Sequence, residues 1–282
     1  GITATDEEIV IDGERNEAVW ENAATAKDFF RITPIDTGLA TARTEVQLTY
    51  NEDYLYAIII CYDTVLGKRP VESLRRDFSF SKNDNFIIFM DTYNDQTNGF
   101  AFGVSAAGAQ WDGIQADGGD VSLDWDCKWY SAVKEHDDHW VAEFAIPFRS
   151  IRYQDGVKEW GINFSRFSLL QNEKSAWAPV PRQFKSSTLA FTGTLQWAKP
   201  PPELGTRFSI IPFLSGQGSE DIEAGDPANS DAAAGLDAKV TLSTSLNLDL
   251  TINPDFSQVE VDRQRTNLDR FELFFPEKRQ FF

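Results

Sequence analysis

The sequence is poor in the residues that most often carry nucleophilic, redox or metal chemistry. It has two cysteines, two histidines and one methionine among 282 residues. Cys61 lies in an apolar run, so we expect it and Cys127 to be buried free thiols, although an oxidising compartment would allow them to pair. His136 and His139 fall in the charged stretch EHDDHW, which predicts an exposed turn rather than a metal pair. The sequence contains no CxxC, no GxSxG and no Gly-rich phosphate loop, so we expect no independent enzyme.

Basic residues are scarce relative to acidic ones, 26 against 44, and the formal net charge is −18. This balance disfavours contacts with a phosphate backbone, so nucleic acid is not expected as a partner. It suits a neutral or cationic ligand, or Ca²⁺. No stretch reaches the ~20 apolar residues of a membrane helix. No signal peptide is visible at Gly1, which we interpret as a signal peptide already removed rather than as evidence for a cytoplasmic protein.

Aromatic residues are abundant, at 13% of the sequence, and they pack well on pleated sheets. Long helical periodicity is missing, and residues 16–23 predict a single helical turn pinned by Trp20. Residues 54–62 are apolar on both faces and predict a central buried strand. Further strand-like segments, separated by polar turns, are residues 9–11, 42–50, 85–93, 100–113, 129–134, 140–146 and 159–170. This spacing predicts an all-β fold, an antiparallel jelly-roll-like β-sandwich over residues 1–198.

The composition and the patterning of the sequence change after the sandwich. Three consecutive prolines predict a stiff linker over residues 199–205. Residues 206–282 then predict a short β-hairpin region, with a loose acidic loop over 219–234 and two strands within 236–252 that are joined by a tight turn. Apolar and polar positions alternate through 236–252. Such alternation is typical of a half-buried strand on a soluble core and equally of a transmembrane barrel strand, and the pattern alone does not separate them.

Several motifs resemble one family of large secreted bacterial proteins. They include VIDGERNEAVW, HWVAEFAIPFRSIRY, EWGINFSRF and, most specifically, NPDFSQVE followed by FFPEKRQFF. In that family, an N-terminal module similar to family 9 carbohydrate-binding modules precedes a predicted outer-membrane β-barrel of unassigned function. The resemblance spans essentially the whole chain. It implies a longer protein, a barrel that begins within residues 206–282, and glycan handling in a periplasmic or outer-membrane-associated place in a Gram-negative cell envelope.

The Phe-rich stretch 269–282, DRFELFFPEKRQFF, is interpreted through the same resemblance as the junction between sandwich and barrel. We expect residues after about 254 to dock on the sandwich or on a neighbouring chain, or to be held loosely.

Sugar-binding sites combine aromatic faces with planar hydrogen-bonding groups. Trp111 follows a Gly/Ala-rich turn and Trp177 lies at a strand end beside a proline, so these two are the best candidates for a pair that clamps a sugar. A packed position in the core or at its rim is the competing interpretation for each. Further ligand candidates are Trp125, Tyr93, Arg75 and Arg76, the arginines because a guanidinium binds a carboxylate or an acidic sugar bidentately. For the arginines, a salt-bridged loop is the alternative.

Calcium is the cofactor that the residues and the resemblance both suggest. Asp91 and Asp95 bracket one hairpin turn, and Asp112 and Asp117 lie in the next crowded acidic stretch. Carboxylate oxygens on loops are what Ca²⁺ prefers, and family 9 modules commonly carry structural calcium. Aspartate is also an ordinary turn residue, and the spacing of an EF-hand is absent, so plain turns remain the alternative.

The leading functional prediction is non-catalytic binding of a glycan or oligosaccharide at the bacterial cell envelope, in polysaccharide uptake or degradation. One alternative is a structural or interaction module that gates or scaffolds an outer-membrane barrel, the chain's own C-terminal continuation, without binding sugar. A weaker alternative is a subunit of a glycoside-hydrolysing system. The sugar hypothesis requires an exposed cleft with at least two aromatic faces and polar side chains between them.

Overall fold

The computed structural model describes residues 1–64, 69, 71–203, 207–219, 229–243 and 246–253. The chain divides into two compact units, residues 1–204 and residues 205–282, which are described separately. None of the described helices is long and apolar enough to cross a membrane. The expectations for residues after about 254 lie outside the described residues.

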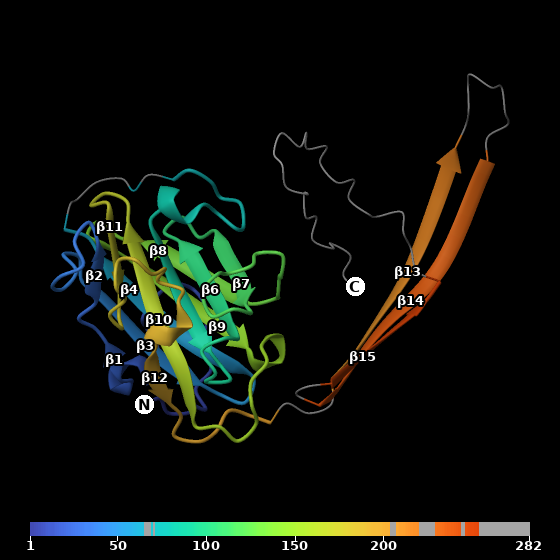
Figure 1. Cartoon of the computed structure of the whole chain (residues 1–282), viewed down its shortest axis with the longest axis horizontal. Coiled ribbons are helices and arrows are strands. Elements are labelled where there is room, and N and C mark those ends of the chain that lie inside the picture. Colours follow the sequence, from blue (N-terminus) through green and yellow to red (C-terminus); the bar gives the residue numbers. More distant parts are fainter. Residues whose placement is uncertain (65–68, 70, 204–206, 220–228, 244–245, 254–282) are drawn as a thin grey trace. The chain divides into compact units, whose positions relative to one another are not determined.

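The first unit is a sandwich of two antiparallel sheets, which confirms the predicted all-β class (Figure 1). The five-stranded sheet has the order β1 (Thr25–Ala26), β3 (Thr44–Tyr50), β4 (Tyr54–Tyr62), β9 (His139–Pro147) and β8 (Tyr130–Glu135). The seven-stranded sheet has the order β2 (Phe30–Thr33), β11 (Glu173–Ala176), β10 (Glu159–Ser168), β5 (Asn85–Asp91), β6 (Gly99–Ser105) and β7 (Gln110–Gln115), and β12 (Gly193–Gln196) also pairs with β10. Short helical turns are α1 (Val19–Asn22), η1 (Phe80–Lys82), η2 (Phe148–Ser150) and η3 (Leu189–Phe191).

Strand β4 shows why the two sheets pack as they do. Its side chains alternate between the faces, and both faces are apolar, as predicted. Leu55, Ile59 and Cys61 point into the core between the sheets. Tyr56 and Ile58 belong instead to a second apolar cluster on the outer face of the five-stranded sheet. The sheet therefore needs a cover on its outer face as well as a partner on its inner one.

The N-terminal segment supplies that cover. Trp20, the predicted pin of α1, is 1% exposed and packs with Ile9 against the outer cluster. Residues 9–11 are not the predicted strand. The backbone at this point instead turns over β9, where the Glu143 carboxylate accepts N–H bonds of 2.9 Å from both Asp12 and Gly13. Side-chain anchoring thus replaces a ladder of backbone bonds.

The two cysteines are free, as expected. Cys61 is buried, whereas Cys127 is only half-buried, so the prediction of burial holds fully for one of them. Burial raises the pKa of each thiol to about 12, which leaves little thiolate for chemistry near neutral pH.

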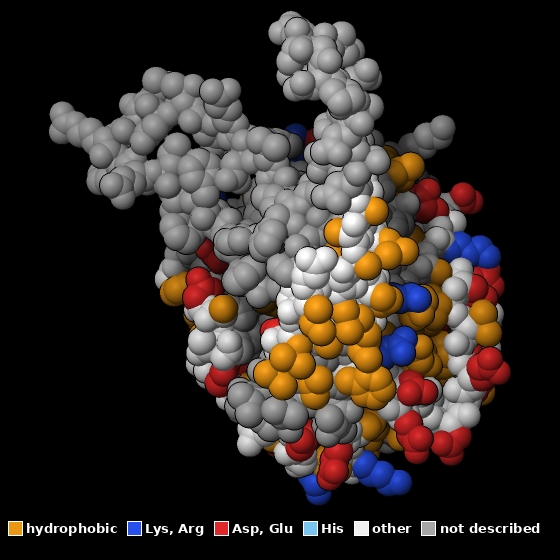
Figure 2. Space-filling view, turned by 90° about the vertical axis from the view of Figure 1, so that its right-hand side faces the viewer, with side chains coloured by type: hydrophobic (Ala, Val, Ile, Leu, Met, Phe, Trp, Pro, Cys, Tyr) orange, Lys and Arg blue, Asp and Glu red, His pale blue; other side chains and the backbone are white. Residues whose placement is uncertain are grey.

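The second unit contains one antiparallel sheet of β13 (Arg207–Ser219), β14 (Asn229–Ser243) and β15 (Leu246–Ile252), in that order. Residues 244–245 of the predicted tight turn lie outside the described residues. The predicted loop over 219–234 is too long, because residues 229–234 pair with β13. Exposed apolar side chains on these strands include Phe208, Ile210, Leu214, Leu250 and Ile252. Figure 2 shows hydrophobic side chains gathered in one area of the face that is turned toward the viewer.

Candidate functional site

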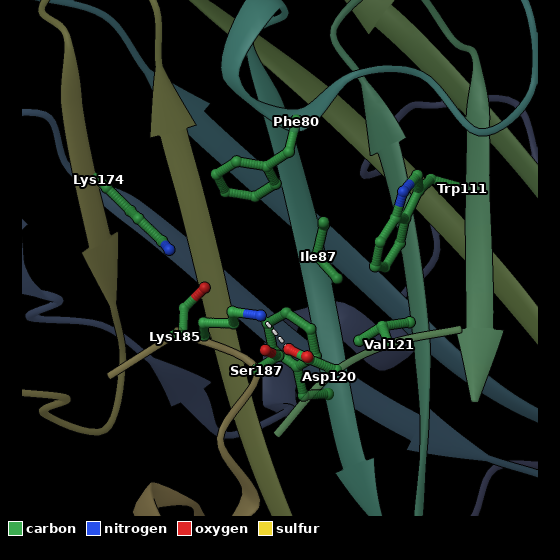
Figure 3. A pocket seen from close by; sticks show the side chains of 10 residues that line it. Phe80, Ile87, Trp111, Asp120, Val121, Lys174, Lys185 and Ser187 are labelled. Atoms are coloured by element: carbon green, nitrogen blue, oxygen red, sulfur yellow. Dashed lines mark hydrogen bonds and ion pairs between the residues drawn. The ribbon is translucent and has the colours of Figure 1, made fainter. Parts of the chain in front are cut away.

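A cavity of about 430 Å³ opens on the outer face of the seven-stranded sheet. Its floor is Ile87 and Phe89, which alternate on β5 with Phe86, Ile88 and Met90. The latter three point into the core between the sheets, so the floor residues must face outward. We call this cavity the outer-face pocket, and its lining residues are Phe80, Ile87, Phe89, Trp111, Asp120, Val121, Lys174, Lys185, Ser186 and Ser187 (Figure 3).

Trp111 forms one wall of the outer-face pocket. It lies on β7, directly across from Gly103 of β6. A Cβ at Gly103 would come within 2.6 Å of the Ile87 side chain and 2.8 Å of the Phe86 carbonyl oxygen, so only glycine allows the floor to stay this low. Trp111 is 8% exposed and packs in one cluster with Ile87 and Phe89.

Phe80 forms the wall above β5. Phe80 begins η1, and Asn85 is the first residue of β5. The side-chain amide of Asn85 donates a 2.7 Å hydrogen bond to the Phe80 carbonyl oxygen. Asn83 holds the same turn by donating to Ser79. The aromatic ring of Phe80 also lies 5.7 Å from that of Phe167 on β10. A second aromatic face is thereby fixed over the pocket.

Two loops close the lower side of the pocket and are tied to each other. The Ser187 hydroxyl donates to the Gly119 carbonyl oxygen at 2.6 Å, and the Leu189 amide donates to Gly118 at 2.8 Å. Lys185 of one loop pairs with Asp120 of the other. Ser187 is 8% exposed, so its hydrogen bond is shielded from water, whereas the Lys185–Asp120 pair is exposed. These loops bring polar groups to the rim of an apolar floor.

Lys174 on β11 is the other basic residue of the pocket. Its ammonium lies 5.1 Å from the centre of the Phe80 ring, and no carboxylate among the described residues forms an ion pair with it. Burial lowers the pKa of Lys174, and the charge of Lys185 lowers it further. Figure 3 shows the Lys174 side chain reaching toward the middle of the pocket from the side opposite Trp111.

The predicted pairing of Trp111 with Trp177 is not formed. Trp177 packs 5.6 Å from Phe164, whose side chain belongs to the core between the sheets, and it fills the space above Gly193. Trp111 lies on the opposite face of the same sheet. Alternation of side chains along the strands separates the two rings, and sequence proximity to turns could not reveal that.

Trp125 and Tyr93 are half-buried and lie outside the pocket lining. Trp125 packs 5.4 Å from Phe100, at the edge of the core between the sheets. Tyr93 is in the β5–β6 turn, and burial raises the pKa of its phenol. Trp125 therefore contributes to the packing of the sandwich.

The predicted arginines are also outside the pocket. Arg75 is exposed. Arg76 is fully engaged: it pairs with Asp112, bonds to Asp126 at 2.7 Å and donates to Gln110 and to the Cys127 carbonyl oxygen. The salt-bridged loop, which was the alternative interpretation, describes Arg76 best.

The four aspartates predicted to hold calcium lie in three places: Asp91 and Asp95 share the β5–β6 turn, Asp112 is buried on β7, and Asp117 lies in the loop that follows β7. Asp91 accepts the amide protons of Asp95 and Gln96, and Asp117 accepts those of Gly119 and Asp120. Asp95 in turn accepts from Thr97 and Asn98. These are the turn-capping bonds that aspartate commonly makes.

Among the described residues, the group of three carboxylates close enough to share an ion is Asp77, Asp112 and Asp126. Arg76 already neutralises two of them, so the donor set does not fit a calcium ion well. Calcium binding stays a prediction.

The pocket residues that the sequence did not single out include Lys174, Lys185, Ser187 and Phe80. The segment EKSA places Lys174 on a strand, but only its register against β10 shows which face it occupies. Lys185 and Ser187 come from a loop without a motif. No signal in the sequence could have grouped these residues.

Comparison with known proteins adds an independent finding. Residues 11–179, more than half of the chain, match the family described as "Carbohydrate family 9 binding domain-like". Residues 204–282 match a domain of unknown function, DUF5916. Comparison with curated proteins gives no match.

Solved structures resemble the sandwich in fold. One is a family 9 carbohydrate-binding module from Caldicellulosiruptor kristjanssonii in complex with cellotriose, at 15% identity and a TM-score of 0.50, covering 72% of this chain and 95% of that one. Another is a proposed carbohydrate-binding protein from Bacteroides uniformis, at 14% identity and a TM-score of 0.54, covering 70% and 96%. Given the extent of the family match, the chain belongs to the carbohydrate family 9 binding domain-like family.

Proposed function

We propose that the sandwich binds a carbohydrate without catalysis and that the outer-face pocket is where it does so. The observation that carries this proposal is a pocket with two aromatic walls, Trp111 and Phe80, within a member of a carbohydrate-binding family. The pocket meets part of the requirement set from the sequence: it has two aromatic side chains over an apolar floor and polar groups at the rim, but Trp111 is only 8% exposed. Phe80 takes the place that was predicted for Trp177.

The chemistry of the pocket suits a sugar. A pyranose ring presents apolar C–H faces, which pack on aromatic side chains, and hydroxyls around its edge, which need polar partners. Trp111 and Phe80 offer the faces, while Ser186, Ser187 and Lys174 offer polar groups. A volume of about 430 Å³ falls within the usual range of roughly 300–1,000 Å³ for small-molecule sites.

The test is a glycan array, followed by calorimetry on the full chain and on Trp111→Ala. We expect binding to at least one glycan and a loss of roughly tenfold or more in affinity for the variant, the upper part of the range for an aromatic contact. Trp125→Ala is the matched control, because it removes a half-buried indole on the other face of the sheet. An absence of binding across a broad panel of neutral and acidic glycans would contradict the proposal.

The context we propose is the cell envelope, with a role in polysaccharide uptake or degradation and the C-terminal unit as the attachment to an outer-membrane barrel. Support comes from the exposed apolar side chains of β13–β15, since such surfaces mark protein or membrane contacts. Phe208 is 76% exposed and Leu214 is 87% exposed. Fractionation of cells that produce the natural protein tests this: recovery in the soluble cytoplasmic fraction would overturn it.

The same exposed strands favour a second candidate function, an interaction module that scaffolds the barrel without binding sugar. The two candidates differ in one measurement. The scaffold function predicts that Trp111→Ala leaves all binding unchanged, whereas the carbohydrate function predicts a loss of glycan affinity; both predict that Phe208→Ser together with Leu214→Ser abolishes membrane recovery.

A further inference from the structure

We propose that the outer-face pocket selects a sugar residue that carries an anionic group, such as a hexuronate, and that Lys174 is the residue that reads the charge. This inference rests on the proposed function and specifies the chemical class of its ligand. A neutral hexose and its uronate differ only at C6, where a hydroxymethyl group becomes a carboxylate. The pocket contains the features needed to tell these two apart.

The first feature is a cation without a carboxylate partner among the described residues. Lys185 is already paired with Asp120 at the rim. Lys174 has the face of Phe80 beneath its ammonium, but none of the described acidic side chains forms an ion pair with it. Asp120 is the acidic residue in the pocket lining, and it is committed to the other lysine. An incoming carboxylate would therefore meet an available charge.

The second feature is the position of that charge relative to the aromatic walls. Lys174 reaches in from β11, and Trp111 stands on the opposite side of the Ile87 floor (Figure 3). A sugar ring lying against the indole would direct one edge toward the ammonium. This division of labour, with one side of the pocket apolar and the other cationic, fits an acidic pyranose better than a neutral one.

The third feature is the partial burial of the ammonium. Burial makes an unpaired charge unfavourable, in line with the lowered pKa of Lys174. An anion that enters the pocket removes this penalty and forms a charge-assisted hydrogen bond, which is stronger than a neutral one. A neutral hydroxyl can accept from Lys174 but cannot neutralise it. The selectivity is local, since the chain as a whole carries a net charge of −18 and repels anions.

The experiment compares methyl β-glucuronide with methyl β-glucoside, and with the glucoside 6-sulfate, by calorimetry on the full chain. We expect the glucuronide to bind roughly tenfold more tightly than the glucoside, as a charged hydrogen bond implies. Lys174→Gln should abolish that difference, and Lys174→Arg should keep most of it. Lys128→Gln, which removes an exposed lysine near Tyr130 on the other sheet, is the control and should retain the wild-type ratio.

Each outcome decides between the ideas. Equal binding of glucuronide and glucoside, or preference for the glucoside, overturns the charge selection and leaves the carbohydrate function standing. The 6-sulfate arm identifies the anion: equal affinity means that any anion at C6 is read, and weaker binding than the glucuronide means a carboxylate. The Lys174→Gln variant is first shown to be folded by its thermal unfolding transition. If it still prefers the glucuronide over the glucoside, the role given to Lys174 is overturned. Failure of all three ligands, and of a wide glycan panel, rejects the proposed function itself.

Discussion

The ammonium of Lys174 lies 5.1 Å from the centre of the Phe80 ring. Lys174 is on strand β11, and Phe80 is in the helical turn η1, which precedes strand β5. The electron-rich face of the ring attracts the cation, and this attraction partly offsets the loss of hydration. Their contact is therefore both a wall of the pocket and a determinant of its charge. It makes Phe80 as informative a target as Trp111.

Replacing Phe80 with leucine tests this relationship directly. Phe80→Leu keeps an apolar side chain but removes the ring face that attracts the cation, so the pKa of Lys174 should fall further. The pKa is measured by NMR after reductive ¹³C-methylation of the lysines. Lys134, paired with Glu14 on the other sheet, serves as the internal reference and should not move. An increase in the Lys174 pKa would contradict the prediction.

Glu143 predicts an unusual dependence of stability on pH. Burial raises the pKa of its carboxyl from 4.5 to about 7, against the opposing effect of the bonds from Asp12 and Gly13. Between pH 4.5 and about pH 7, Glu143 is therefore protonated in the folded chain and ionised in the unfolded chain. Stability from this group is accordingly largest below pH 4.5 and falls as pH rises to about 7, by no more than about 3 kcal/mol. Above that range the contribution is constant.

Urea unfolding at pH 5 and pH 8 checks this sign. The wild type should be more stable at pH 5, and Glu143→Gln should show a smaller difference between the two pH values. Asp84 contributes in the same direction, because burial raises its pKa to about 6, so Asp84→Asn isolates the remainder. A wild-type stability that rises from pH 5 to pH 8 would show the assignment to be wrong.

Arg76 should be essential for stability rather than for ligand binding. It pairs with Asp112, whose side chain is fully buried, so Arg76→Gln leaves a buried carboxylate without its charged partner. We expect the free energy of unfolding to fall by up to about 3 kcal/mol, less than for a fully buried pair, because the Arg76 side chain is 33% exposed. Adding Asp112→Asn should recover part of the loss. The measurement is denaturant unfolding of both single variants and the double variant, and strictly additive losses would argue against a coupled pair.

The sandwich could be predicted from local patterns because its strands are marked by short apolar runs and its hairpins by polar turns. Residues 54–62 are apolar on both faces, which fixes β4 as a central strand, and short polar turns fix the hairpins around it. Prediction failed where contacts between residues distant in the sequence decide the structure. Residues 9–11 look like a strand, yet the Glu143 carboxylate, more than a hundred residues away in sequence, captures the backbone that follows.

The sequence by itself determined the all-β class, the central strand β4 and the presence of aromatic side chains able to hold a sugar. Only the tertiary structure decided which of them line the outer-face pocket. Alternation along the strands sends Trp111 outward and Trp177 inward, and the sheet register then brings Lys174 of β11 over the same floor as Trp111. Pairing with Asp112 likewise holds Arg76 away from the lining of the outer-face pocket. Side-chain direction and non-local pairing arise when strands assemble, so no stretch of sequence contains them.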